Sequence, residues 1–361
     1  ADAPAADAPA ADAPAADAPA ADAPAADEAA AIITKVALVT DVGTIDDESF
    51  NQACWEGVEE WCKANGLEYT YYQPTEDSTD ARILSIAQAI AEGADTIVMP
   101  GYLFGATLTV VMEEYPDVNF IAVDVGSGDL TVDYATYYEP AANTACLTFS
   151  EEQAGYLAGY AAVKDGYTKL GFLGGMAVPA VIRYGYGYVQ GVDAAAKELG
   201  ITVDMKYAYG NQFFGDADIT AVMDTWYAGG TEVVFACGGG IYTSAAEAAK
   251  KVGGKVIGVD TDQKGVIDGL YGEGMTITSA MKGLYPTTID TLTDIIVKGN
   301  WDNYKGKIET LGLVSGDDAS LNYVQIPTTT QFSDKFSAED YAAMVKKMFD
   351  GTIKVSNDIV N

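Results

Sequence analysis

The chain has 361 residues, enough for two domains of ordinary size, and 49% of them are hydrophobic, which is ample for a buried core. It carries 53 Asp and Glu against 20 Lys and Arg, for a formal net charge of −33, and it has no histidine. The negative charge argues against nucleic acids and anionic membrane surfaces as partners, because both would be repelled. Without histidine, Ser-His-Asp and Cys-His catalysis and His-ligated zinc sites are excluded.

The first 34 residues form an Ala/Asp/Pro repeat that we expect to be a disordered linker. Residues 1–25 are five copies of ADAPA, and no large apolar side chain occurs among them. Such a segment cannot bury enough surface to order itself, and its regularly spaced prolines favour an extended chain. We interpret it as a spacer between a membrane anchor and a globular module, with a passive solubilising tail as the alternative. We find no signal peptide, lipobox cysteine or apolar run of about 20 residues.

From Lys35 onward, short apolar strands alternate with helical segments, the order typical of doubly wound parallel sheets. The predicted strands span 36–40, 68–72, 96–99, 120–123, 169–173, 202–207, 233–236, 256–259 and 275–279. The predicted helices span 51–64, 79–92, 103–115, 151–164, 186–198, 219–228, 243–252 and 286–297.

These elements fall into two similar halves, which predict an α/β protein with two Rossmann-like lobes and parallel sheets. We expect one lobe at 35–145 plus about 283–302, and the other at 146–282 plus about 303–361. In such sheets ligands bind beyond the carboxyl ends of the strands, so the ligand cleft is expected between the lobes.

Polar residues follow several of the predicted strands and are therefore expected to converge on this cleft. They are Asp41, Asp124, Asp260 and Lys282, with Phe50, Phe213 and Phe214 in nearby loops. Carboxylates accept hydrogen bonds from OH and NH groups, and phenyl rings stack on other π systems. The set suits a neutral ligand with hydroxyls and a flat ring, and it suits phosphate poorly because acidic residues would repel it.

The cysteines do not form a recognisable framework. Cys54, Cys62, Cys146 and Cys237 include no CxxC pair, and the first two would lie about two turns apart on one helix, too far apart for a disulfide. We expect four small buried hydrophobic residues, and leave open a bridge from either of the other two.

Two further motifs have a structural alternative to a functional one. Asp46, Asp47 and Glu48 precede an apolar helix, and we expect them to cap it rather than to bind a cation. The glycines in RYGYGYVQG imitate a dinucleotide fingerprint, but their spacing is GxGxxxG and no strand directly precedes them.

Gly239 lies in the CGGG segment that ends a predicted strand. Successive glycines there either bring backbone N–H groups close to a ligand or only form a tight turn.

Six motifs, taken in order, resemble the basic membrane lipoprotein family, the purine-nucleoside-receptor type of ABC-transporter substrate-binding proteins. The motifs are TDVGTIDDESFNQACWEG, EEQAGYLAGYAA, GFLGGMAVPAVIRYGYGYVQG, FFGD, GVDTDQ and SAMK, and the match covers about 35–325. The resemblance implies a type I periplasmic-binding-protein fold and an extracytoplasmic protein that delivers a purine nucleoside to an ABC permease. It also implies a lipid anchor in the full-length precursor. We expect a monomer that binds no nucleic acid, cofactor or metal and catalyses no reaction.

The resemblance also assigns roles to individual residues. Phe50 and Phe214 resemble the two aromatic walls that sandwich the base, with Phe213 as the alternative to Phe214. The polar assignments are Asp41 and Asn51 at or near the base edge, and Asp124, Asp260 and Lys282 as ribose and closure contacts.

Other functions remain as alternatives. TDVGTIDD resembles the calcium-binding motif of nucleoside hydrolases, but Val39 stands where Asp is expected and the usual histidine acid is missing. A ligand-binding surface sensor without a transporter is the third class. Among transport receptors of this type, the aromatic pair would also suit another planar heterocycle such as riboflavin.

Overall fold

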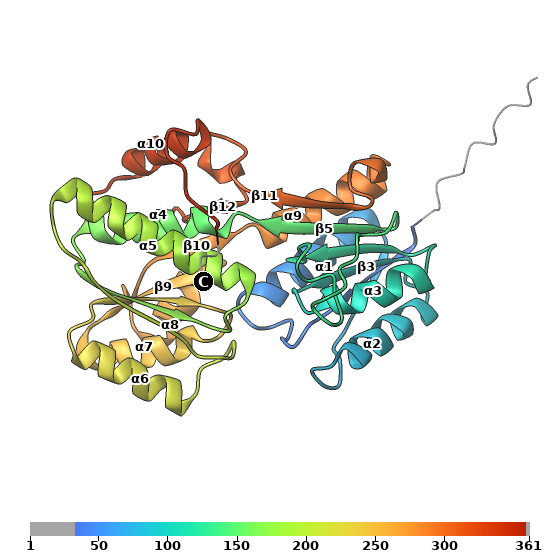
Figure 1. The fold of residues 1–361 in the computed structure, drawn as a ribbon, viewed down its shortest axis with the longest axis horizontal. Coiled ribbons are helices and arrows are strands. Elements are labelled where there is room, and N and C mark those ends of the chain that lie inside the picture. Colours follow the sequence, from blue (N-terminus) through green and yellow to red (C-terminus); the bar gives the residue numbers. More distant parts are fainter. Residues whose placement is uncertain (1–32, 359–361) are drawn as a thin grey trace, which may run out of the picture. The chain divides into compact units, whose positions relative to one another are not determined.

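The computed structural model describes residues 33–358, which belong to one folded unit built around two sheets (Figure 1). The Ala/Asp/Pro repeat, and with it the expected linker, lies outside the described residues. Both sheets have six strands, and apart from the antiparallel pair β10–β12 their neighbouring strands run parallel. The predicted α/β class with two parallel sheets is confirmed.

The first sheet defines lobe one, with strand order β11-β5-β4-β3-β1-β2. Its strands are β1 (Lys35–Val39), β2 (Glu68–Tyr72), β3 (Thr96–Pro100), β4 (Asn119–Val123), β5 (Thr144–Phe149) and β11 (Lys307–Leu311). Its helices are α1 (Phe50–Asn65), α2 (Thr79–Ala91), α3 (Phe104–Glu114) and α9 (Leu284–Leu292), which continues as a π-helical turn over Thr293–Val297. Fully buried Val, Ile, Leu and Phe side chains on the central strands form its core, as expected for a parallel sheet covered on both faces.

The second sheet defines lobe two, with strand order β12-β10-β9-β8-β6-β7. Its strands are β6 (Lys169–Gly174), β7 (Asp204–Tyr209), β8 (Val233–Cys237), β9 (Lys255–Asp260), β10 (Thr276–Lys282) and β12 (Val324–Gln325). Its helices are α4 (Glu151–Asp165), α5 (Pro179–Leu199), α6 (Ala217–Ala228), α7 (Tyr242–Val252), α8 (Lys264–Tyr271) and α10 (Ala338–Phe349). Short 3-10 helices occur at Trp301–Asn303 and Ala319–Leu321.

The chain passes between the sheets at Ser150, at Gly283 and over residues 312–323. The boundaries expected from the sequence, at 145 and at about 302, therefore fall before the ends of two lobe-one strands, β5 and β11. The π-helical turn and the 3-10 helix at 301 separate α9 from β11, so the helical pattern ends well before the chain leaves lobe one.

All nine predicted strands and all eight predicted helices are present, most within two residues of the predicted ends. Helix α5 begins at Pro179, seven residues before its predicted start at 186, because a proline at the first helical position starts a helix well and the nearby glycines obscured the helical pattern. Strands β5, β11 and β12 and helices α8 and α10 were not predicted. β11 is only partly buried and its KIETL sequence carries three polar residues, so it lacks the apolar run that marked the other strands.

The glycines of the GxGxxxG segment serve to pack helices. A side chain at Gly187 would overlap the backbone carbonyl of Glu152, and one at Gly191 would overlap the carbonyl of Tyr156. Helices α4 and α5 therefore approach each other backbone to backbone, side by side in the upper part of lobe two in Figure 1. The motif thus lies inside helix α5, at a close helix–helix contact.

The four cysteines are all buried and unpaired, as expected for small hydrophobic residues. Within residues 33–358, no helix combines the length and the hydrophobicity that crossing a membrane requires.

Candidate ligand-binding site

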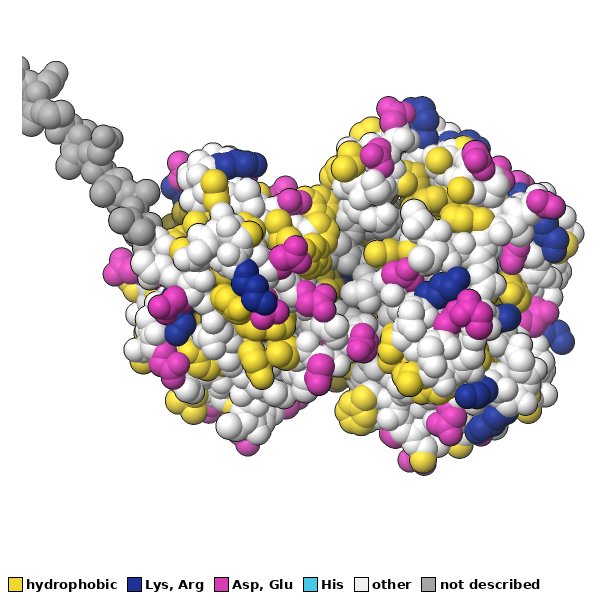
Figure 2. Space-filling view, turned by 180° about the vertical axis from the view of Figure 1, so that it is seen from behind, with side chains coloured by type: hydrophobic (Ala, Val, Ile, Leu, Met, Phe, Trp, Pro, Cys, Tyr) yellow, Lys and Arg dark blue, Asp and Glu magenta, His cyan; other side chains and the backbone are white. Residues whose placement is uncertain are grey.

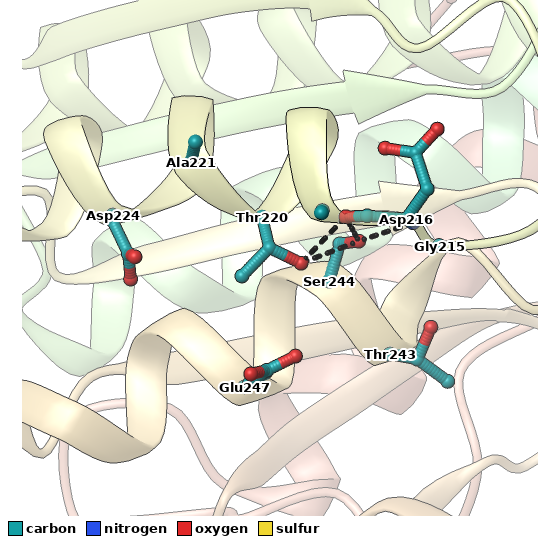
Figure 3. Close-up of a pocket in the computed structure, with 9 residues that line it drawn as sticks. Gly215, Asp216, Thr220, Ala221, Asp224, Thr243, Ser244 and Glu247 are labelled. Atoms are coloured by element: carbon teal, nitrogen blue, oxygen red, sulfur yellow. Dashed lines mark hydrogen bonds between the residues drawn. The ribbon is translucent and has the colours of Figure 1, made fainter.

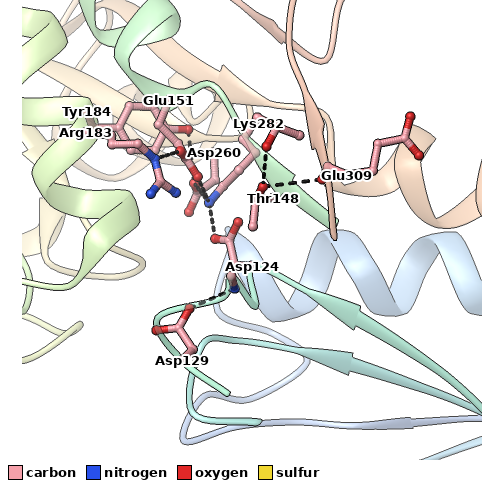
Figure 4. Close-up of polar contacts among 11 residues, drawn as sticks. Asp124, Asp129, Thr148, Glu151, Arg183, Tyr184, Asp260, Lys282 and Glu309 are labelled. Atoms are coloured by element: carbon pink, nitrogen blue, oxygen red, sulfur yellow. Dashed lines mark hydrogen bonds and ion pairs between the residues drawn. The ribbon is translucent and has the colours of Figure 1, made fainter. Parts of the chain in front are cut away.

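The site is built around one buried ammonium group at the boundary between the lobes. Lys282, the last residue of β10, places its Nζ 2.5 Å from Asp124 Oδ2 and 3.9 Å from Asp260 Oδ1 (Figure 4). Asp260 is the last residue of β9, in lobe two, whereas Asp124 directly follows β4 in lobe one. All three side chains are buried. The structure thus brings together three residues that the sequence predicted at strand ends, and one of the contacts spans the two lobes.

Both aspartates hold their position through an uncommon backbone conformation. Asp124 has φ 64° and Asp260 has φ 63°, in the left-handed region that aspartate tolerates better than most residues. The chain therefore turns sharply at each strand end, and both carboxylates face the same ammonium.

A second ion pair, between Glu151 and Arg183, adjoins Lys282. Glu151, the first residue of α4, places Oε1 3.4 Å from Lys282 Nζ and accepts a hydrogen bond from Arg183 Nε at 2.6 Å through Oε2. The Tyr184 hydroxyl, next to Arg183 on α5, donates to Asp260 Oδ1 at 3.4 Å. Neither Glu151 nor Arg183 was predicted as a site residue. The motifs EEQAG and VIRYG were the signals that contained them.

Burial and charge act in opposite directions on these groups. Burial raises the pKa of Asp124 to about 7 and also raises that of Asp260, although the Lys282 ammonium opposes both shifts. Burial alone would lower the pKa of Lys282, but the carboxylates of Asp124, Glu151 and Asp260 hold it above its ordinary value. Lys282 therefore keeps its charge in a buried place because three carboxyl groups surround it.

Direct contacts across the lobe boundary extend beyond this pair. The Ser49 hydroxyl donates to Asp260 Oδ2 at 2.8 Å. The Glu48 carbonyl accepts from Thr261 Oγ1 at 3.2 Å and from Gln263 Nε2 at 3.2 Å. Ser49 and Glu48 precede α1 in lobe one, whereas in lobe two Asp260 ends β9 and Thr261 and Gln263 follow it. These contacts were not predicted, because they depend on how the lobes face each other.

Asp41 and Asn51 form a second polar group, within lobe one. Asp41 Oδ1 accepts from the backbone N–H groups of Val42 at 2.6 Å and Gly43 at 2.9 Å, and from Asn51 Nδ2 at 3.2 Å. Burial raises the pKa of Asp41, although these hydrogen bonds oppose the shift. Asn51 is buried, and its Oδ1 has no hydrogen-bond partner among residues 33–358.

The acidic segment before α1 serves to cap that helix. Asp47 accepts from the backbone N–H groups of Ser49 at 3.0 Å, Asn51 at 3.0 Å and Gln52 at 3.1 Å. These bonds satisfy donors that the first turn of a helix leaves free. The capping interpretation is confirmed for Asp47, and residues 33–358 contain no cluster of acidic or cysteine side chains that would hold a metal ion.

The aromatic candidates differ in their surroundings. Phe50 opens α1, and Lys282 Nζ lies 4.9 Å from its ring centroid, within the range of a cation–π contact. Phe213 is half-buried against the backbone of Gly175, Gly238 and Gly239, whereas Phe214 is 61% exposed. Phe50 thus belongs to the cluster around Lys282, and Phe214 lies at the surface of lobe two.

Gly239 is linked to the lobe boundary through Gln263. Its carbonyl accepts from Gln263 Nε2 at 3.3 Å, the same nitrogen that donates to the Glu48 carbonyl of lobe one. With φ 50°, Gly239 has the left-handed conformation of a tight turn.

Two surface features help to locate the ligand. On the face shown in Figure 2 a furrow runs along the boundary between the lobes, with acidic side chains on both sides of it. A separate hollow of about 420 Å³ lies within lobe two between α6 and α7 (Figure 3). There the Thr220 and Ser244 hydroxyls bond each other at 2.9 Å, and Asp224 and Glu247 line its wall. None of the predicted site residues lines this hollow, so the lobe boundary remains the candidate site.

The comparison with protein families decides the affiliation of the chain. A family model described as the PnrA-like ABC transporter substrate-binding proteins matches residues 33–349. The chain belongs to this family. The family predicted from the six motifs is thereby confirmed, and PnrA-like proteins are solute-binding components of ABC transporters.

Relatives of this PnrA-like protein include the ABC transporter nucleoside-binding protein BmpA of Lactococcus lactis subsp. cremoris, 31% identical over 243 residues. The match covers 64% of this chain and 64% of the relative, less than two thirds of its length. A CD4+ T-cell-stimulating antigen of Listeria monocytogenes is 31% identical over 264 residues, covering 68% of this chain and 69% of the antigen.

Solved structures of similar fold include two ABC transporter solute-binding proteins. The solute-binding protein from Aeropyrum pernix K1 matches with a TM-score of 0.67 at 20% sequence identity, and the match covers 89% of this chain and 87% of that protein. The solute-binding protein from Conexibacter woesei matches with a TM-score of 0.67 at 22% sequence identity, and the match covers 90% of this chain and 99% of that protein. These likenesses confirm the type I binding-protein fold that the sequence predicted.

Proposed function

We propose that this PnrA-like protein is an extracytoplasmic, lipid-anchored receptor that binds a purine nucleoside between its lobes and delivers it to an ABC permease. Ligand contacts from both lobes favour the closed arrangement, because only closure engages both sets of groups. The permease then recognises the closed receptor.

The observation that carries this proposal is the pair of buried acceptors without donors. Within the described part of the chain, Asp124 Oδ1 and Asn51 Oδ1 have no hydrogen-bond partner, although both side chains are at least nine-tenths buried. Buried acceptors without partners are costly, so a ligand that brings OH and NH groups to them would be bound favourably. A nucleoside carries both kinds of donor, hydroxyls on its ribose and N–H groups on its base.

The charge around Lys282 favours a nucleoside over a nucleotide. Its ammonium already contacts Asp124, Glu151 and Asp260. A phosphate placed here would meet more negative than positive charge, whereas neutral hydroxyls would find acceptors.

The stacking walls of the proposed site are Phe50 and Phe214. The first touches the Lys282 ammonium, and the second is exposed and free of the packing that holds Phe213. Phe214→Ala should therefore weaken nucleoside binding with little loss of stability, while Phe213→Ala should mainly lower the free energy of unfolding. The reverse result, with Phe213→Ala weakening binding and Phe214→Ala leaving it unchanged, would mean that Phe213 is the second stacking wall.

The test is a calorimetric screen of guanosine, inosine and adenosine, with their 5′-monophosphates, free bases and riboflavin as comparisons. We expect at least one nucleoside to bind at micromolar Kd or tighter and its monophosphate to bind much more weakly. Asp124→Asn should weaken that binding about tenfold or more, since a buried charged acceptor is lost. The matched control is Asp117→Asn, an exposed aspartate before β4, which should leave the Kd unchanged.

Three results would overturn the proposal. They are no binding by any nucleoside, tighter binding of riboflavin, and release of free base and ribose on incubation with calcium, which would indicate a hydrolase.

A further inference from the structure

Glu151 is the most deeply buried acidic residue at the lobe boundary, and none of the proposed ligand contacts accounts for it. Its side chain has no solvent exposure. One carboxylate oxygen faces Lys282 Nζ at 3.4 Å, and the other accepts from Arg183 Nε at 2.6 Å. A fully buried carboxylate with two basic partners is a costly arrangement to retain unless its position matters.

The neighbouring residue shows what burial does without such partners. Burial raises the pKa of Glu152 to about 7, and no other residue that the structure describes forms a hydrogen bond with its Oε2. For Glu151, burial acts in the same direction, but the charges of Lys282 and Arg183 hold its pKa below the ordinary value. Glu151 is therefore an anion when Glu152 next to it is partly protonated.

The places where the chain crosses between the lobes decide which partners of Lys282 stay with it when the lobes move. Glu151 follows the crossover at Ser150, and Lys282 precedes the crossover at Gly283, so both belong to lobe two. Asp124 belongs to lobe one. If the lobes separate, Lys282 leaves Asp124 but stays beside Glu151.

We infer that Glu151, held by Arg183, is a positioning residue that keeps the Lys282 ammonium directed across the lobe boundary toward Asp124. Glu151 does not touch the ligand and acts through Lys282. The inference rests on the proposed function for its link to nucleoside binding, while the geometry of lobe closure is a separate readout.

The first experiment is a mutant cycle read by calorimetry with guanosine, inosine and adenosine. Glu151→Gln keeps the shape of the side chain and removes its charge. We expect it to weaken binding on the order of tenfold in the wild-type background and less than twofold in a Lys282→Met background, since it acts through that lysine. An equal loss in both backgrounds would indicate a general structural role and would overturn the inference.

The matched control comes from the same helix pair. Glu198 of α5 pairs with Lys164 of α4 at 2.9 Å, far from the lobe boundary and half exposed. Glu198→Gln should leave the Kd unchanged. Arg183→Met removes the positive charge beside Glu151 and should weaken nucleoside binding. Arg183→Lys keeps that charge and should retain most of the wild-type affinity.

A second experiment needs no ligand. Spin labels on Leu84→Cys of α2 and Val222→Cys of α6, both exposed, report the distance between the lobes, and the native cysteines are buried. Glu151→Gln should broaden this distance distribution toward longer values, with no further broadening when Lys282→Met is also present. An unchanged distribution would contradict the inference. If wild-type protein binds no nucleoside while this broadening persists, the proposed function fails and the positioning role stands.

Discussion

Helices α4 and α5 carry an ion pair at each end of their contact, and the two pairs have different surroundings. At the amino-terminal ends, Glu151 pairs with Arg183 at 2.6 Å, and the Glu151 side chain is fully buried. At the carboxyl-terminal ends, Lys164 pairs with Glu198 at 2.9 Å, and the Glu198 side chain is 53% exposed.

The difference lies in what each pair touches next. The buried pair contacts Lys282, which in turn contacts Asp124 across the lobe boundary. In the exposed pair Glu198 also accepts a hydrogen bond from the Tyr160 hydroxyl at 2.5 Å, and its side chain faces solvent. An exposed pair contributes little to stability, because water screens it and its side chains lose conformational freedom. A buried pair becomes costly when one partner is removed. The same type of ion pair therefore adjoins the candidate site at one end of the helix contact and lies at the solvent-exposed surface at the other end.

The largest effect is expected from Lys282→Met, which removes the cation shared by the buried end. Asp124 and Asp260 would be left without their basic partner, so the free energy of unfolding should fall by about 3–5 kcal/mol at pH 8. The loss should shrink toward pH 5, where buried carboxyls take up protons. Urea denaturation at both pH values measures it, with Lys164→Met as the control at the exposed end. A change below about 1 kcal/mol at pH 8 would show that the buried cluster does not need its cation.

The next effect concerns the pH dependence that Glu152 confers. Its pKa is raised from an ordinary 4.5 to about 7 in the folded protein, so between those pH values the native state binds a proton that the unfolded chain releases. The free energy of unfolding therefore falls as the pH rises through this window and stays reduced above it. Glu152→Gln should remove this slope and be more stable than wild type by up to roughly 3 kcal/mol at pH 8, with little difference at pH 4. Parallel stability profiles of the two proteins from pH 4 to pH 8 would contradict the assignment.

A smaller effect is expected from separating the two helices. Gly187→Ala places a methyl group against the Glu152 carbonyl, so α5 must shift away from α4 near the Arg183–Glu151 pair. Overpacking of this kind costs about 1–3 kcal/mol. Gly269→Ala in α8, where a side chain meets nothing within 4 Å, should instead be neutral or stabilising by up to about 1 kcal/mol. Thermal unfolding of the two variants measures the difference. Equal Tm shifts for Gly187→Ala and Gly269→Ala would argue against close packing of α4 on α5.

The smallest effect is expected at the exposed end. Glu198→Gln should change the free energy of unfolding by less than about 1 kcal/mol, and 0.5 M salt should remove most of that difference. Denaturant titrations at low and high salt measure it. A loss as large as that of Lys282→Met would mean that the two ends do not differ in the way their burial indicates.

The alternation of apolar strands with helical segments was enough to predict the lobes, because strand and helix periodicity are local properties of the chain. Strand β11 escaped prediction because it is half-exposed and polar. The ends of β4 and β9 were predicted within one residue and that of β10 three residues too early, and Asp124, Asp260 and Lys282 do meet in the structure. All the ligand roles stay predictions: those assigned by resemblance at Asp41, Phe50, Asn51, Asp124, Phe214, Asp260 and Lys282, and the one that the CGGG pattern suggested for Gly239.

The sequence by itself determined the fold class, the family and the polar residues at the strand ends, since each depends on local patterns and on motifs read in order. Only the tertiary structure decided what those residues contact. Glu151 and Arg183 meet because glycines let α4 and α5 approach closely, and Ser49 reaches Asp260 because the two lobes face each other. Contacts between elements far apart in the chain depend on packing distances and relative orientation, and no local pattern encodes either.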